Sequence, residues 1–208
     1  MKKRKHWLCS SIHIGEIATC LEVHQQLSAK HKGLLTIIAP RHPENGPMIR
    51  EAAQNLGLIC AQRSKGEPIQ NTTQIYIADT VGELGLFYHL NQIAFIGGSL
   101  IPHGGQNMIE PTRLGCIPLV GPYTSNFAEI VHKMIKNKVL ICIMNTAQLG
   151  EEVDTLLREP AKLQELLDNA IVSSQHQDEI LIKTTHMIIG YLDDTIDKAK
   201  NLEPAQPN

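Results

Sequence analysis

Short apolar runs rich in β-branched residues alternate with helical patterns along most of this 208-residue chain. The alternation constrains the fold strongly, because strands separated by helices form a mostly parallel sheet covered on both faces. We therefore predict an α/β, doubly wound, Rossmann-like domain. Its predicted strands are residues 6–11, 34–39, 58–62, 74–78, 92–97, 117–120 and 139–143, and its predicted helices are residues 15–29, 46–56, 82–90, 107–114, 126–137 and 146–158.

The sequence beyond Pro160 contains only helical patterns, so we predict a helical C-terminal end. Apolar residues at helical spacing form one stripe within 163–170 and another within 180–192. We expect one domain over residues 1–198 and a flexible tail over residues 199–208.

Composition limits the partners that the chain can have. Lys and Arg number 19 against 21 Asp and Glu, and aromatic residues make up 4%, so we expect no nucleic acid partner. The cysteines are scattered without zinc spacing, and no apolar run is long enough to cross a bilayer. We therefore expect a cytoplasmic protein. The basic start at residues 2–5 fits a membrane-surface patch or a solvated entry to the first strand, and the second interpretation is favoured.

The segment 97–111 indicates a function most directly. It follows the predicted strand 92–97 with a glycine-rich loop and then begins a helix. Glycines let the backbone approach a ligand closely, and a helix start presents unpaired N–H groups to phosphate. Asn107 and Glu110 share one face of the first turn, where Glu110 could accept both hydroxyls of a ribose. The loop lacks the G-x-G-x-x-G pattern, so we predict a nucleotide site without nicotinamide chemistry.

Polar residues also follow several other predicted strands, at the edge where open α/β sheets bind ligands. A guanidinium such as that of Arg41 matches two phosphate oxygens, and backbone N–H groups at residues 81–83 could receive a phosphate or a base edge. Structural alternatives remain open: a surface ion pair for Arg41, a turn cap for His42 and an ordinary first helical turn at 82–83. His13 and His103 lack paired ligand spacing, so we expect neither a metal nor a cofactor.

Four ordered motifs resemble the C-terminal half of the 3-deoxy-D-manno-octulosonic acid (Kdo) transferases, two-domain B-type glycosyltransferases of lipopolysaccharide assembly. The motifs are residues 39–44 (APRHPE), 79–84 (DTVGEL), 95–100 (FIGGSL) with 104–111 (GGQNMIEP), and 121–127 (GPYTSNF). The resemblance implies that the domain binds the CMP part of the donor CMP-Kdo.

The resemblance also implies roles for particular residues. Arg41 and His42 would contact the phosphate side of CMP. The cytidine pocket would be lined by Val81, Gly82 and Glu83, the phosphate and ribose would be held by Asn107, Met108, Ile109 and Glu110, and the donor sugar would lie near Ser11, His13 and Glu16.

The chain departs from the family pattern in two ways. The motif at residues 11–17 usually reads STHEGEE, and Ile12, Ile14 and Ile17 replace three polar positions here. In the family, a membrane-anchored N-terminal domain carries the acceptor site and the carboxylate that acts as general base, and we expect that domain to be absent from this chain. Sugar transfer needs such a base. The resemblance therefore implies a partial glycosyltransferase, inactive alone, that reaches the lipid A precursor and the cytoplasmic face of the inner membrane through the other domain.

Two alternatives remain open. The chain could belong to another sugar-nucleotide enzyme of the same architecture, such as a uridine-diphosphate-sugar transferase or epimerase. It could also be a degenerate, non-catalytic nucleotide-binding module, which the isoleucines of the first motif favour somewhat.

Overall fold

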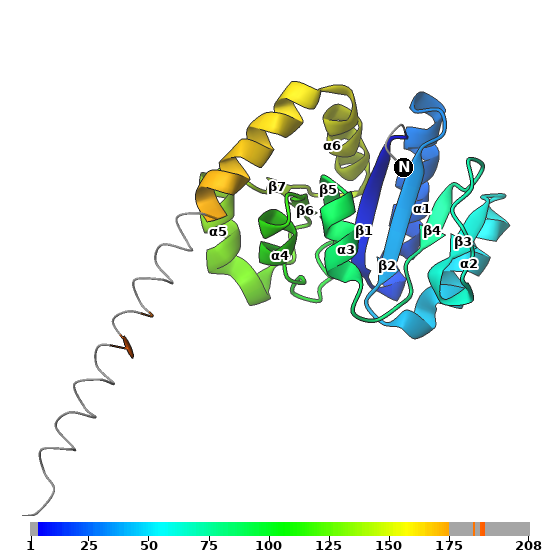
Figure 1. The fold of residues 1–208 in the computed structure, drawn as a ribbon, viewed down its shortest axis with the longest axis horizontal. Coiled ribbons are helices and arrows are strands. Elements are labelled where there is room, and N and C mark those ends of the chain that lie inside the picture. The colour runs from blue at the N-terminus through cyan, green and yellow to red at the C-terminus, as the bar shows by residue number, and fades with distance from the viewer. Residues whose placement is uncertain (1–3, 175–184, 186–187, 190–208) are drawn as a thin grey trace, which may run out of the picture. The chain divides into compact units, whose positions relative to one another are not determined.

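The sheet predicted from the sequence is present in a computed structural model that describes residues 4–174, 185, 188 and 189. Its strands lie in the order β3-β4-β2-β1-β5-β6-β7 (Figure 1), and every pairing is parallel. The prediction of a parallel, doubly wound α/β domain is confirmed. The strands are β1 (His6–Ile12), β2 (Leu35–Pro40), β3 (Cys60–Gln62), β4 (Ile75–Ile77), β5 (Ile93–Ile96), β6 (Ile117–Val120) and β7 (Ile141–Cys142).

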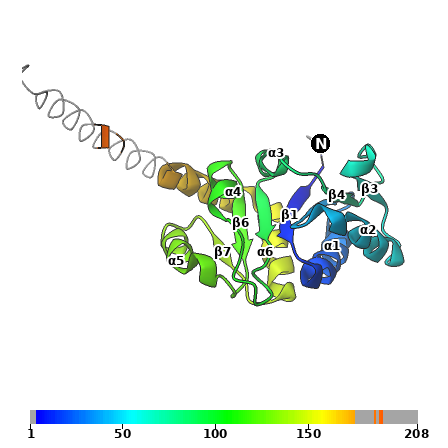
Figure 2. The same cartoon turned by 90° about the horizontal axis from the view of Figure 1, so that it is seen from below.

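Helices cover both faces of this sheet (Figure 2). On one face α3 contacts β1 through Tyr88 and Ser10, and on the other α1 contacts β2 through His24 and Thr36. The α-helices are α1 (Ile17–Lys30), α2 (Gly46–Asn55), α3 (Leu84–Leu90), α4 (Ile109–Arg113), α5 (Ala128–Lys136) and α6 (Thr146–Arg158). Short 3-10 helices are η1 (Ile14–Glu16), η2 (Pro43–Asn45), η3 (Arg63–Lys65) and η4 (Ser125–Phe127). None of the helices in the described ranges is both long and apolar enough to span a membrane.

The core lies between the sheet and its helices. Each residue of β2 is buried, because helices cover the sheet on both faces. Such a strand needs a nearly continuous apolar run. Burying a side chain such as Ile37 or Ile38 stabilises the fold by roughly 1.5–3 kcal/mol. The polar exception is Thr36, whose hydroxyl accepts from the Trp7 indole at 2.7 Å and bonds His24 Nδ1 at 2.8 Å. This contact connects β1, β2 and α1 inside the core.

Several boundaries differ from the predicted ones for local reasons. The helix predicted from residue 82 begins at Leu84, because Gly82 has a left-handed φ of 83°. The helix predicted from residue 107 begins at Ile109, and its N–H donates to Asn107 Oδ1 at 3.0 Å. β4 lies between β2 and β3, so residues 63–74 cross over without an α-helix. η3 is the only regular helical turn within residues 63–73, all of which the structure describes.

The chain divides into two compact units, Met1–Ile171 and Val172–Asn208. Residues 160–174 are helical, which agrees with the predicted helical end as far as the description extends. The predicted tail over residues 199–208 lies outside the described residues. So does the predicted stripe over 180–192, except for Thr185, Ile188 and Ile189.

Candidate functional site

A cleft of about 350 Å³ lies at the carboxyl edge of the sheet, beside the point where the strand order reverses between β1 and β5. Loops that follow β1, β2, β4 and β5 line it together with α3. Ligands of open α/β sheets bind at such a reversal point. The predicted site residues that line this cleft are Ser11, Arg41, His42, Val81, Gly82, Asn107 and Glu110.

Tyr88 forms part of the cleft floor and had not been predicted. Its hydroxyl bonds the Ser10 hydroxyl, and the side chain is almost completely buried. Burial raises the pKa of Tyr88, and the nearby Glu110 carboxylate raises it further. The phenol is therefore neutral at physiological pH. A tyrosine within a helical pattern usually indicates a core position, so the sequence offered little signal for it.

Arg41 projects from the end of β2 as a free cation. It is exposed, and no carboxylate of the described residues forms an ion pair with its side chain. Its backbone N–H donates to the Ile12 carbonyl at 2.9 Å, which fixes the start of its loop against β1. Neighbouring His42 lies 3.9 Å from Glu44, a loose contact between exposed side chains. The surface ion pair considered for Arg41 is therefore not formed, and its charge faces the cleft without a partner.

The start of α4 supplies the opposite charge. Glu110 is exposed and lines the cleft, whereas Met108 is completely buried in the core. Gly85 on α3 lies beside the carboxylate, and a Cβ there would make an ordinary van der Waals contact of 3.6 Å with Glu110 Oε1. The Asn107 side-chain oxygen accepts from the Ile109 N–H, so its amide nitrogen remains as a donor toward the cleft. Of the predicted group 107–110, two side chains thus line the cleft.

Glu16 lies beneath the glycine-rich loop rather than in the cleft. It is completely buried, and its carboxylate accepts four backbone N–H groups: Gly98 at 2.7 Å, Leu100 at 3.1 Å, and Ser99 and His13 at 3.2 Å. These bonds use both carboxylate oxygens. Any influence of Glu16 on a donor sugar is consequently indirect, through the loop that it holds.

The end of β1 bends sharply where it meets this loop. Ser11 has a left-handed φ of 54°, and the pairing register with β2 shifts between Ser10 and Ile12. A Cβ on Gly97 would overlap the Ser11 carbonyl, so only glycine lets the two loops approach this closely. The bulge places Ser11 on the cleft wall.

His13 lies beside the cleft within a group of imidazoles. Its ring centroid is 4.0 Å from that of His103 and 6.4 Å from that of His42. Burial lowers the pKa of His13, and the neighbouring histidines and Arg41 lower it further. A neutral His13 can accept from Gln106 Nε2, which lies 3.3 Å from its Nε2. No cluster of three His, Cys, Asp or Glu side chains suited to a metal occurs in the described part of the chain.

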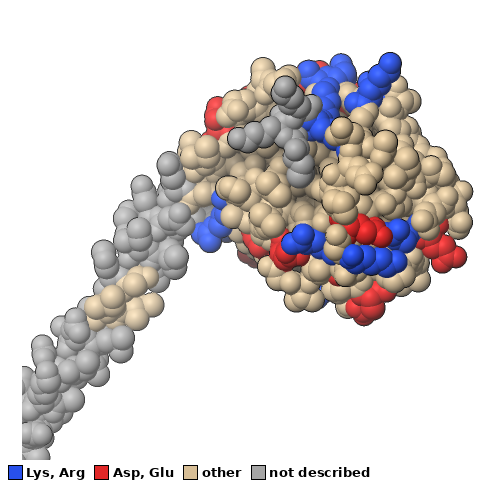
Figure 3. Space-filling view, turned by 45° about the vertical axis from the view of Figure 1, so that its right-hand side comes forward, with Lys and Arg blue, Asp and Glu red and all other residues tan. Residues whose placement is uncertain are grey.

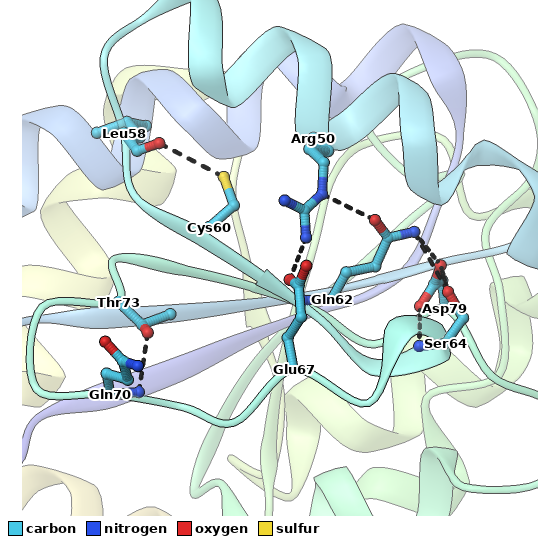
Figure 4. Close-up of polar contacts among 9 residues, drawn as sticks. All are labelled: Arg50, Leu58, Cys60, Gln62, Ser64, Glu67, Gln70, Thr73 and Asp79. Atoms are coloured by element: carbon cyan, nitrogen blue, oxygen red, sulfur yellow. Dashed lines mark hydrogen bonds and ion pairs between the residues drawn. The ribbon is translucent and has the colours of Figure 1, made fainter.

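The loop at residues 79–83 is anchored at its first residue, as Figure 4 shows. The Asp79 carboxylate accepts from Gln62 Nε2 at 2.6 Å, Ser64 Oγ at 2.7 Å and Ser64 N at 3.0 Å. Burial alone would raise the pKa of Asp79, but these hydrogen bonds outweigh it and hold the pKa below its usual value. A Cβ on Gly46, the first residue of α2, would overlap this carboxylate. Asp79 thus connects the cleft loop to α2 and to the end of β3.

The tip of the same loop is open. Val81 is 85% exposed. Glu83 points away from the cleft, since its carboxylate accepts from Arg63 Nη2 at 2.6 Å and Arg63 Nε at 3.0 Å. The hydrogen bonds from Arg63 and Thr80 lower the pKa of Glu83 to about 2. From this loop, Val81 and Gly82 line the cleft and Glu83 does not.

This fold and cleft define a class. A parallel α/β sheet that carries a cation, a glycine turn and a free carboxylate around a cleft at its reversal point is typical of a nucleotide-binding domain. The chain is 35% identical to the C-terminal CMP-Kdo binding domain of WaaA from Acinetobacter baumannii, with a TM-score of 0.80 over 84% of this chain and 91% of that one. The chain belongs to the Kdo transferase family, in which it corresponds to the C-terminal domain.

Curated relatives agree with this assignment. The Kdo transferase of Haemophilus influenzae is 34% identical over 80% of this chain, and a probable mitochondrial Kdo transferase of Arabidopsis thaliana is 36% identical over 79%. The chain spans 39% and 38% of the length of these two relatives. The C-terminal domain of a group 1 glycosyltransferase from Francisella tularensis shares the fold at 11% identity, with a TM-score of 0.55. No family model matches the chain.

Proposed function

We propose that this domain binds CMP-Kdo and supplies the donor side of Kdo transfer to a lipid A precursor. A domain carrying the acceptor site and a general base would complete the reaction at the cytoplasmic face of the inner membrane. The observation that carries the proposal is the shared cleft: Arg41 and Gly82, from two separate loops, and Glu110, from the first turn of α4, line one cavity.

The chemistry of the cleft suits a nucleoside monophosphate. Its volume of about 350 Å³ lies within the range of roughly 300–1,000 Å³ common for small-molecule sites. Arg41 would bind the phosphate, whose negative charge grows as the bond to the sugar breaks. Glu110 would accept the ribose hydroxyls, and the backbone of Val81 and Gly82 would meet the cytosine edge. Asn107, through its amide nitrogen, would add a donor to phosphate.

We assign none of the described residues to the attacking side of the reaction. Inverting transfer needs a base that removes the acceptor hydroxyl proton. Glu110 is assigned to ribose, and both oxygens of Glu16 accept backbone N–H groups. We therefore expect the chain alone to bind donor without transferring sugar.

Titration calorimetry with CMP, UMP, UDP and cytidine tests this function. We expect CMP to bind more tightly than either uridine nucleotide. Arg41→Ala should weaken CMP binding about tenfold or more, because a charge-assisted bond to phosphate contributes roughly 1.5–3 kcal/mol. The same change should leave cytidine binding unaltered. Lys136→Ala, on the exposed end of α5, is the matched control for loss of one positive charge.

Each alternative gives a different result. Tighter binding of UDP than CMP would assign the chain to a uridine-nucleotide enzyme of the same fold. Absence of binding to every nucleotide would indicate a degenerate module. Equal loss of CMP and cytidine affinity in Arg41→Ala would remove Arg41 from the phosphate site.

A further inference from the structure

A second hollow, which we call the amino-edge groove, lies at the opposite edge of the sheet from the cleft. It has a volume of about 940 Å³, and its floor includes His6 at the start of β1, Leu35 at the start of β2, and Tyr76. Phe87 of α3 lies beside Tyr76, with ring centroids 6.2 Å apart.

Two basic runs that are distant in the sequence meet at this groove. Arg4 and Lys5 precede β1. Lys30 is the last residue of α1, and Lys32 follows it before β2. The parallel pairing of His6 with Leu35 brings the two runs together. Figure 3 shows Lys and Arg side chains gathered at the upper edge of the molecule. The sequence shows the first run as the basic start at residues 2–5, and the second run lies about 25 positions later, so only the fold shows that they share one edge.

Part of this charge is already neutralised. Lys30 Nζ lies 2.9 Å from Asp154, and Arg63, at the far end of the groove, pairs with Glu83. Glu67, the acidic residue of the lining, pairs with Arg50. These ion pairs leave a smaller number of unpaired cations that could attract a ligand.

Three cations of the groove have no carboxylate partner among the described residues: Arg4, Lys5 and Lys32. Lys5 Nζ lies 3.1 Å from Nδ1 of His31, which carries no negative charge, so this contact does not neutralise the ammonium. Arg4 donates to the backbone carbonyls of residues 33, 34, 70 and 73, which orients its guanidinium but does not neutralise it. A net positive field therefore remains over the amino edge.

We propose that the amino-edge groove docks on the phosphate groups of an anionic lipid bilayer. A site for a single soluble phosphate needs convergent donors, such as a free guanidinium fork or a nest of backbone N–H groups. Here the Arg4 fork already binds carbonyls, and Lys5 and Lys32 supply exposed point charges. Dispersed lysines of this kind are attracted to the diffuse negative potential of a membrane surface. Because the groove lies at the amino ends of the strands, docking leaves the nucleotide cleft at the carboxyl ends open.

Co-sedimentation of the full chain with vesicles tests the proposal. Vesicles of phosphatidylcholine are compared with vesicles that also contain phosphatidylglycerol, at low and at physiological salt. We expect binding only to the anionic vesicles and weaker binding at higher salt. The double variant Lys5→Gln/Lys32→Gln should bind roughly 25-fold more weakly, since each lysine near such a surface contributes about a fivefold factor.

A matched control has the same net charge as the Lys5→Gln/Lys32→Gln variant. Lys133→Gln/Lys136→Gln removes two exposed lysines from α5, outside the groove, and should change vesicle binding less than about threefold. Melting temperature and CMP titration of both variants check that each remains folded. Equal losses in the two double variants, equal binding to neutral vesicles, or no binding to anionic vesicles at low salt would each overturn the proposal. Displacement from vesicles by millimolar inorganic phosphate at constant ionic strength would also overturn it, and would assign the groove to a soluble anion.

Discussion

Two carboxylates at the carboxyl edge, Glu16 and Glu110, have opposite environments. Both follow a strand and both were predicted to lie at the donor site. Glu16 is completely buried and accepts four backbone N–H groups, whereas Glu110 is exposed on the cleft wall. The comparison separates residues that build the site from residues that are free to bind a ligand.

The contrast also limits where a phosphate can bind. The N–H groups of Gly98, Ser99 and Leu100 are the donors that a glycine-rich loop would usually offer to an anion. Here an internal carboxylate already occupies them. In the proposed function, the phosphate would therefore rely on Arg41 and on the Asn107 amide. The glycine loop would act mainly as a support that Glu16 holds in place.

Glu16→Ala gives the largest expected effect. It leaves buried N–H groups without acceptors, each costing about 1–3 kcal/mol, so the free energy of unfolding should fall by about 4 kcal/mol. Urea denaturation followed by circular dichroism measures this fall. Glu22→Ala, on the exposed face of α1, is a control expected to cost less than about 0.5 kcal/mol. A loss below about 1 kcal/mol for Glu16→Ala would show that water or a rearranged loop satisfies these donors.

The same contrast between buried and exposed groups applies to histidines. His24 is buried with no partner for Nε2, and burial lowers its pKa to about 4, with a smaller effect of Arg4. Between pH 6.5 and 4 the unfolded chain binds more protons than the folded one. The neutral, buried state of His24 therefore costs no stability above the unfolded pKa. As the pH falls to about 4, the free energy of unfolding should decrease by about 3 kcal/mol in total.

Denaturation midpoints across this pH range test the histidine prediction. His24→Leu should flatten the dependence of unfolding free energy on pH, and His132→Leu, which alters an exposed histidine of α5, should not. His6 and His13 also have lowered pKa values, so some slope remains in every variant. Identical slopes for the wild type and His24→Leu would contradict the buried neutral state of His24.

Much of the fold could be predicted because its determinants are local. β6 and α6 begin and end at the predicted residues, since apolar runs and caps such as Asn145, which accepts from the Gln148 N–H, are visible in the sequence. The prediction that Arg41, Gly82 and Glu110 meet at one edge needed only the assumption that the strands are parallel. These inferences need only the direction of each strand.

Side-chain direction within the loops could not be predicted. Glu16 and Glu83 are acidic residues beside glycines in the sequence, like residues of a binding site. The structure turns one under the glycine loop and the other toward Arg63 on a neighbouring loop. Both partners are tens of residues away in the chain, and only the packed sheet brings them together.

Asp79→Ala should have an intermediate effect, because Asp79 supports the cleft loop from outside the cleft. The change removes the acceptor of Gln62 and Ser64, and we expect a loss of about 2 kcal/mol in unfolding free energy. The affinity for CMP should also fall, since the 80–82 loop loses its anchor. Asp168→Ala, in an exposed helical pair with Gln164, is the matched control. If Asp79→Ala lost the expected stability but kept its affinity for CMP, Asp79 would have no role in shaping the cleft.

Glu110→Ala should have the smallest effect on stability and a selective effect on binding. The side chain is exposed, so unfolding free energy should change by less than about 0.5 kcal/mol. If Glu110 accepts the ribose hydroxyls, the affinity for CMP should fall about tenfold, equivalent to about 1.4 kcal/mol. The affinity for 2′,3′-dideoxycytidine monophosphate, which lacks both hydroxyls, should hardly change. If the variant lost affinity equally for both nucleotides, Glu110 would act through the shape or charge of the cleft rather than through the ribose hydroxyls. Glu110 and Glu16 would then differ in exposure but not in a shown contact with ligand.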